Sequence, residues 1–79
     1  MELRHLRYFV AVVEEQSFTK AAEKLFIAQP PLSRQIQNLE AELDIQLFER
    51  GSRPLKTTEA GQFFYQHAVK LLSNAEEIK

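Results

Sequence analysis

The chain has no cysteine, no long apolar run and no excess of positive charge. Without cysteine, neither a disulfide framework nor a thiolate metal site can form, so packing or a partner chain must stabilise the core. No apolar run approaches the length of a membrane span, and the first residues lack the apolar stretch and cleavage site of a signal peptide. From 79 residues, 44% of them hydrophobic, we expect one small soluble domain that is cytoplasmic and does not contact a membrane.

The balance of charge does not by itself favour a nucleic-acid partner. Ten Lys and Arg stand against eleven Asp and Glu, a formal net charge of -1, whereas a stand-alone nucleic-acid binder is commonly basic. The acidic residues cluster at or beyond the ends of the expected helices. Four cations therefore remain available to line one side of the molecule: Arg34, Arg50, Arg53 and Lys56. An ordinary mixed, solvated surface explains the same composition equally well.

The sequence does not favour an enzyme. His5 and His67 are far apart in the chain, and no set of nucleophile, base and orienting residue can be recognised. The sequence contains no cluster of metal-ligating residues either, so His67 is expected on a helix surface or in packing. We therefore expect neither a metal ion nor a cofactor.

The first third of the chain predicts two helices. An amphipathic helix from about residue 3 to residue 16 carries apolar residues at the spacing of a core-facing stripe. A short helix over residues 18–25 follows Ser17, whose hydroxyl can accept from an unpaired backbone N–H in the first turn. This second helix contains Ala21 and Ala22, a pair small enough to let another helix cross at close range.

The third predicted helix, at about residues 29–43, has two different faces. Pro30 and Pro31 fit its first turn, because backbone N–H groups there have no internal partner. Its apolar residues recur at helical spacing and form one stripe: Leu32, Ile36, Leu39 and Leu43. The opposite face carries polar side chains, small apolar groups and one cation: Gln29, Pro30, Ser33, Arg34, Gln37 and Asn38. Such a surface resembles that of a helix that reads the major groove of DNA.

A two-stranded β wing is predicted after this helix. Residues 45–48 and 55–57 read as short extended segments, and the GSRP sequence between them reads as a hairpin tip in which Gly51 can adopt positive φ. Arg50 and Arg53 make the tip basic, which suits insertion beside a phosphate backbone or into a minor groove. The alternative is an ordinary exposed loop with two solvated arginines.

The last predicted helix begins after Thr58, a good capping residue, and runs to the end of the sequence. Its apolar residues form a seam with coiled-coil spacing: Phe64, Ala68, Leu71, Ala75 and Ile78. Three further apolar residues lie outside the seam and are expected to pack back on the domain: Phe63, Val69 and Leu72. This arrangement predicts a homodimer through the last helix. The alternative is one broad stripe that faces the chain's own core.

The chain resembles a known family along nearly its whole length. The resemblance is carried by AAEKLFIAQPPLSRQIQNLEAELDIQLFER followed by TEAG, motifs that occur in the order and at the spacing of the family. The chain is similar to the N-terminal DNA-binding domain of LysR-type bacterial transcriptional regulators. The resemblance implies a winged helix-turn-helix and a long linker helix that pairs antiparallel in a homodimer, with an effector-binding domain beyond it. The QPPLS version of the motif resembles the branch that controls degradation of aromatic compounds.

The resemblance also implies roles for individual residues. It places the DNA-reading part of the recognition helix at Gln29, Pro30, Pro31, Ser33, Arg34 and Gln37. It places contacts to the DNA backbone on the second helix and in the wing, at Thr19, Lys20, Arg50, Arg53, Pro54 and Lys56. Arg suits the acceptors of guanine, Gln suits adenine, and proline rings offer apolar contact to thymine methyl groups. Two residues depart from the family's pattern: Ala28 replaces the usual capping serine, and Thr57 replaces a commonly apolar residue.

The sequence thus predicts a mainly α fold: a winged helix-turn-helix, with a three-helix core and a two-stranded β wing, followed by a long linker helix. We divide it into a DNA-binding domain, residues 1–57, and a dimerisation helix, residues 58–79. The expected function is sequence-specific binding of double-stranded DNA at an interrupted dyad by a homodimer, with higher oligomers and a small-molecule effector belonging to the full-length protein. The alternative is a winged-helix module for protein interaction or dimerisation that does not read DNA sequence.

Overall fold

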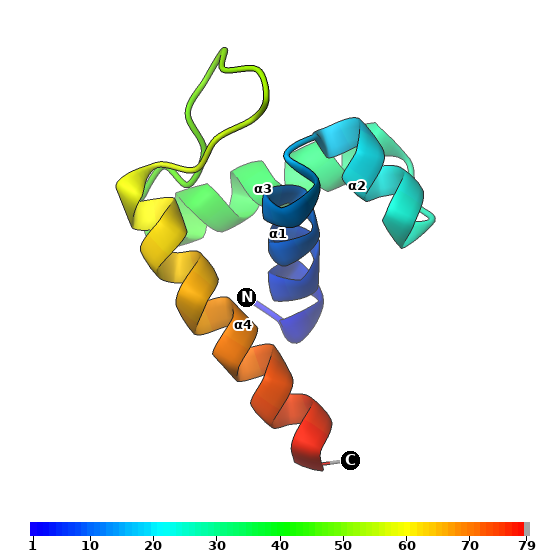
Figure 1. Cartoon of the computed structure of the whole chain (residues 1–79), viewed down its shortest axis with the longest axis vertical. Coiled ribbons are helices and arrows are strands. Elements are labelled where there is room, and N and C mark those ends of the chain that lie inside the picture. The colour runs from blue at the N-terminus through cyan, green and yellow to red at the C-terminus, as the bar shows by residue number, and fades with distance from the viewer. Residues whose placement is uncertain (79) are drawn as a thin grey trace.

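The computed structural model describes residues 1–78, with side chains described as far as Ala75. It contains four helices: α1 (Leu3–Glu15), α2 (Phe18–Leu25), α3 (Gln29–Leu43) and α4 (Glu59–Ile78) (Figure 1). The helices predicted from the sequence are confirmed, with α1 ending one residue earlier than expected. Within this described part of the chain, no helix is long and apolar enough to cross a membrane.

Helix α1 is the centre of the fold. It packs against α2, α3 and α4, while α2 also packs against α3. Phe9 of α1 is fully buried, and its ring centroid lies 5.5 Å from that of Phe48 and 5.2 Å from that of Phe64. Tilted and edge-on aromatic pairs of this kind add to the free energy of apolar burial. One aromatic cluster therefore joins α1, the segment after α3, and α4.

The first three helices are separated by very short connections. Each ends at a residue other than glycine in the left-handed region: Gln16 (φ 54°), Phe26 (φ 58°) and Asp44 (φ 56°). The backbone N–H of each donates back to a carbonyl in the preceding turn, as left-handed C-caps commonly do. The chain therefore reverses sharply after α1 and α2, and Ser17 caps α2 as predicted, accepting from the backbone N–H of Lys20 at 3.1 Å.

The segment between α3 and α4 corrects the prediction of two β strands. Across residues 1–78 the structure has a single antiparallel bridge, between Phe48 and Thr57. The two backbone donors that would extend this bridge into a ladder are bonded elsewhere: Leu47 donates to the Glu40 carboxylate and Lys56 to the Ser52 hydroxyl. Residues 48–57, called the wing below, therefore form an irregular hairpin that projects beyond the helices (Figure 1). Its tip contains Gly51 at φ 76°, the positive φ that the sequence predicted.

Candidate nucleic-acid interface

Helix α3 separates its two faces as the sequence predicted. Leu32, Ile36 and Leu39 are buried against the rest of the domain. The residues proposed to read DNA all lie on the other side or at the helix start; Gln29 and Ser33 are half-buried, and Pro30, Pro31, Arg34 and Gln37 are exposed. We call these six residues the reading face. The helix begins at Gln29 without a side-chain cap from Ala28, and the two prolines lie in its first turn.

The cation of the reading face has no acidic partner in the described part of the chain. The ion pairs there join Glu2 to Arg4, Glu15 to Lys24, Glu40 to Arg50 and Glu42 to the N-terminal amine. Arg34 takes part in none of them. Its guanidinium therefore keeps its donors for a ligand, although the net charge of the chain is slightly negative.

The start of α2 and the tip of the wing line one groove. Its volume is about 730 Å³, and it brings together four of the residues expected at the DNA backbone: Thr19, Lys20, Arg53 and Pro54. All four are exposed. Lys20 and Arg53 thus add a second positive surface to Arg34, built from segments that are distant in sequence.

The other two cations assigned to the wing lie elsewhere. Arg50 donates through Nη2 to Glu40 Oε1 at 2.9 Å, so part of its charge is satisfied inside the chain. Lys56 lines a different groove, together with Thr57 and Gln62. The structure therefore joins Arg53, but not Arg50 or Lys56, to the groove at the start of α2.

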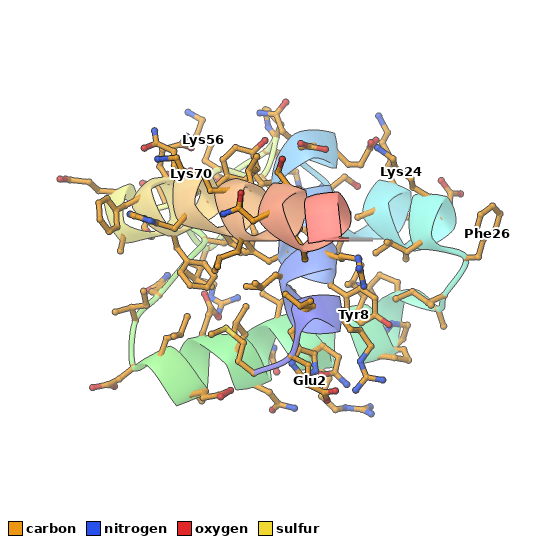
Figure 2. The ribbon with its side chains drawn as sticks, turned by 90° about the horizontal axis from the view of Figure 1, so that it is seen from below. Glu2, Tyr8, Lys24, Phe26, Lys56 and Lys70 are labelled. Carbon is orange, nitrogen blue, oxygen red and sulfur yellow. The ribbon has the colours of Figure 1, made fainter. Side chains whose placement is uncertain are left out.

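Sequence reasoning missed two residues near the helix-turn-helix. Glu40 is only 8% exposed, and its carboxylate accepts from both the wing and the segment that leads into it. Its position four residues after the buried Ile36 was the available signal, because that spacing returns to the core-facing side of a helix. Phe26 lies at the turn between α2 and α3 and is 95% exposed, with its ring pointing away from both helices (Figure 2).

Helix α4 carries a second exposed surface, which is apolar. Phe63 is 65% and Leu71 52% exposed, and Val69 is also exposed. The Phe63 ring lies 4.5 Å, centroid to centroid, from the imidazole of His67, which is exposed on this helix. Residues spaced by four share one stripe of a helix, so Phe63, His67 and Leu71 form a continuous surface.

The observed faces of α4 differ from the predicted seam. Phe64 packs against the core and Ala68 is buried within it, so these two seam residues already have partners inside the chain. Leu72 packs against the core as predicted. Phe63 and Val69, which were expected to pack back on the domain, are exposed instead. Ala75 is half-buried, and the side chain of Ile78 lies outside the described residues.

One hydrogen bond fixes the middle of α4 to the end of α1. The Tyr65 hydroxyl donates to Glu14 Oε2 at 2.9 Å. This hydrogen bond to a carboxylate raises the pKa of the Tyr65 phenol above its ordinary value of 10.0, and burial and the negative charge of Glu14 raise it further. Among the side chains that the structure describes, as far as Ala75, no group of three or more potential metal ligands gathers at one place.

The chain matches a family described as bacterial regulatory helix-turn-helix protein, lysR family, over residues 3–62. It is 81% identical over 78 residues to the HTH-type transcriptional regulator BenM of Acinetobacter baylyi, covering 99% of this chain and 26% of that protein. It is 58% identical over 72 residues to CatR of Pseudomonas putida, covering 91% of this chain and 25% of that one. The chain therefore spans about a quarter of the length of these curated relatives.

Solved structures show the same architecture. A BenM_DBD complex with benA site 1 DNA superposes with a TM-score of 0.97 at 81% identity, over 99% of this chain and 88% of that one. A complex of CbnR_DBD with DNA superposes with a TM-score of 0.92 at 43% identity, over 98% of this chain and 88% of that one. In both structures the protein is bound to DNA, and its chain is nearly the same length as the chain described here.

Proposed function

The chain belongs to the LysR family of bacterial regulatory helix-turn-helix proteins, and we propose that it binds double-stranded DNA sequence-specifically as the DNA-binding domain of a transcriptional regulator. The observation that carries this proposal is the reading face of α3, which is solvent-accessible and includes Arg34, without an acidic partner among the side chains of residues 1–75. DNA complexes of similar chains support it. This role is one of binding, not of catalysis.

In this proposal α3 enters the major groove. The Arg34 guanidinium donates to the O6 and N7 acceptors of guanine, and the amides of Gln29 and Gln37 pair with adenine. Pro30 and Pro31 present apolar surface to thymine methyl groups. Ser33, on the flank of this face, donates to a base edge or to a phosphate oxygen.

The groove between α2 and the wing supplies contacts to the DNA backbone. Lys20 and Arg53 neutralise phosphates, the Thr19 hydroxyl adds a neutral donor, and Pro54 shapes the tip beside Arg53. Contacts to phosphate position the protein on the duplex but carry no information about sequence. The structure thus separates a sequence-reading surface on α3 from a positioning surface at the wing.

We also propose that two copies pair through α4 and read an interrupted dyad. The exposed Phe63 and Leu71, which share one stripe of the helix, support this, because contiguous apolar surface on a small domain commonly marks an interface. We retain the division into residues 1–57 for DNA binding and 58–79 for dimerisation. In the longer protein, the proposal places effector binding and any higher oligomer beyond this chain. We further propose that the protein is cytoplasmic. We also propose that it belongs to the aromatic-degradation branch of the family, and the 81% identity to BenM supports this assignment.

Fluorescence anisotropy on two duplexes tests the function. The chain is titrated onto benA site 1 DNA and onto a scrambled duplex of equal length and composition, over a salt series. We expect the site duplex to bind at least about tenfold more tightly, and both affinities to fall as salt rises. Binding to neither duplex, or an affinity independent of salt, would instead support a module for protein interaction. Equal affinity for both duplexes would show that the chain binds DNA but does not recognise the benA site 1 sequence.

A further inference from the structure

Glu40 is a buried acid that joins α3 to the wing and to the segment before it. Its Oε2 accepts from the backbone N–H groups of Leu47 at 2.7 Å and Phe48 at 3.3 Å. Its Oε1 accepts from Arg50 Nη2 at 2.9 Å. In the part of the chain that the structure describes, Glu40 is the only charged residue that is buried. Both oxygens of this carboxylate are thus used on the same short segment.

The chemistry of the position requires a carboxylate. Burying a charge is costly unless it is paired and hydrogen-bonded, and this site supplies one cation and two amide donors. An ionised carboxylate is an acceptor at both oxygens, so it satisfies donors on two sides. A glutamine would place an NH2 group against one of those donors. An apolar residue would leave the Leu47 and Phe48 N–H groups without their partner.

Other bonds hold the wing together but do not join it to α3. Glu49 donates to the Lys56 carbonyl within the wing, and Leu55 donates to the Gln16 carbonyl at the end of α1. Among the described hydrogen bonds, those of Glu40 are the ones that connect the recognition helix to the wing. Phe48 anchors the base of the wing by packing on Phe9 and Phe18, and the direct hydrogen-bonded link from the wing to α3 depends on the Glu40 side chain.

We propose that Glu40 is a positioning residue for DNA binding: it holds the wing so that Arg53 reaches the backbone while Arg34 is in the major groove. This inference rests on the function proposed above, because it concerns how two parts of one DNA interface are kept in register. Arg50 then serves mainly as the partner of Glu40 rather than as a ligand for phosphate. Glu40 itself contacts no DNA.

Two consequences of Glu40→Gln, the removal of a negative charge and the loss of the wing's placement, have opposite expected effects on DNA affinity. The substitution removes a negative charge from a protein that binds a polyanion, so charge alone would strengthen binding. Loss of the wing's position would weaken it. Glu49→Gln is the matched control, because Glu49 is exposed in the same wing, its carboxylate makes no ion pair with the described side chains of residues 1–75, and the charge change is identical.

The binding test uses benA site 1 DNA and combined variants. We expect Glu40→Gln to weaken binding at least about fivefold and Glu49→Gln not to weaken it. Adding Arg53→Ala to Glu40→Gln should cost less than Arg53→Ala costs alone, because the misplaced Arg53 has already lost much of its contact. When Gln29→Ala is added to Glu40→Gln instead, the two losses in affinity should multiply, because Gln29 contacts the DNA independently of the wing. The inference would be overturned if Glu40→Gln bound DNA as tightly as Glu49→Gln. It would also be overturned if the losses in affinity from Glu40→Gln and Arg53→Ala multiplied in full in the double variant.

A measurement on the free protein tests the same inference without DNA. In the parent, the amides of Leu47 and Phe48 should be protected from hydrogen exchange, and the heteronuclear NOE values of residues 49–56 should indicate order. Glu40→Gln should lose both signals while the α3 amide shifts persist, and Glu49→Gln should keep them. An ordered wing in Glu40→Gln would overturn this inference, whether or not the parent binds DNA. Failure of the parent to bind any duplex would overturn the proposed function instead. If Glu40→Gln unfolds, Arg50→Ala removes one of the three bonds and should loosen the wing partially; a fully ordered wing there would overturn the inference.

Discussion

The carbonyl oxygen of Leu47 occupies the space that a side chain on Gly61 would need. A Cβ built on Gly61 would lie 2.0 Å from that oxygen and 2.9 Å from the carbonyl carbon. The same oxygen accepts from the backbone N–H of Thr58 at 3.0 Å, and the Thr58 hydroxyl accepts from the Gly61 N–H at 2.9 Å. The start of α4 is therefore locked against the segment that leads into the wing, and glycine is what permits the close approach.

We predict that Gly61→Ala destabilises the domain although alanine favours helix. Overpacking against backbone costs about 1–3 kcal/mol, whereas alanine gains about 0.5–1 kcal/mol in a helix interior. The net loss should lower Tm by several degrees in a domain of this size, measured by thermal unfolding. Ala60→Gly, at the exposed neighbouring position, gives the helix-propensity effect alone. A Gly61→Ala variant more stable than the parent would contradict the close packing.

The bond between Tyr65 and Glu14 predicts a dependence of stability on alkaline pH. The folded pKa of Tyr65 is raised above 10.0, so the folded state favours the protonated phenol. Its contribution to stability is therefore fully present below pH 10 and is lost as pH rises through the folded pKa. Tyr65→Phe should be about 0.5–1 kcal/mol less stable than the parent at pH 7.

Urea unfolding of both proteins from pH 7 to pH 11 measures this effect. The gap in unfolding free energy between parent and Tyr65→Phe should close as the pH rises above 10. Tyr8→Phe is the matched control for loss of a phenol oxygen, because the Tyr8 hydroxyl makes no hydrogen bond with the described side chains of residues 1–75. If the difference in unfolding free energy stayed constant with pH, the hydrogen bond from the Tyr65 hydroxyl would not be its cause.

We predict that Leu71→Glu weakens self-association through α4. Leu71 is half-exposed on the stripe that also carries Phe63, and a buried, unpaired carboxylate in an interface is strongly unfavourable. Sedimentation velocity should show a dimer for the parent and at least a tenfold weaker dimer for Leu71→Glu. Ser73→Glu adds the same charge at an exposed position of the same helix and should sediment as the parent. Identical behaviour of Leu71→Glu and the parent would exclude this surface.

The bounds of the helices could be predicted because their signals are local. Ser17 caps α2, Pro30 and Pro31 mark the start of α3, and the apolar periodicity of each helix follows from its own sequence. The same periodicity gave most of the reading face of α3, whereas Pro31 was assigned to it by the family resemblance. These features depend on residues within a few positions of each other, so no knowledge of the tertiary fold was needed.

The features that were not predicted depend on contacts between distant segments. The bridge in the wing does not extend into strands because the N–H groups of Leu47 and Lys56 donate to the side chains of Glu40 and Ser52 instead of to the facing segment. The two faces of α4 could not be told apart, because which face meets Phe9 depends on how α4 crosses α1. Phe26 could not be recognised as an exposed left-handed cap, since an apolar aromatic side chain suggests burial.

The most direct test of the account compares Gln29→Ala with Arg53→Ala on benA site 1 DNA and on the scrambled duplex. Gln66→Ala, at an exposed position of α4, controls for loss of an amide side chain. Gln29→Ala should cost about 1–3 kcal/mol on the site duplex and leave the scrambled duplex unchanged, because it removes a base contact. Arg53→Ala should weaken both duplexes by the same factor, because it removes a phosphate contact. Equal losses on both duplexes for Gln29→Ala would contradict the claim that the start of α3 reads DNA sequence.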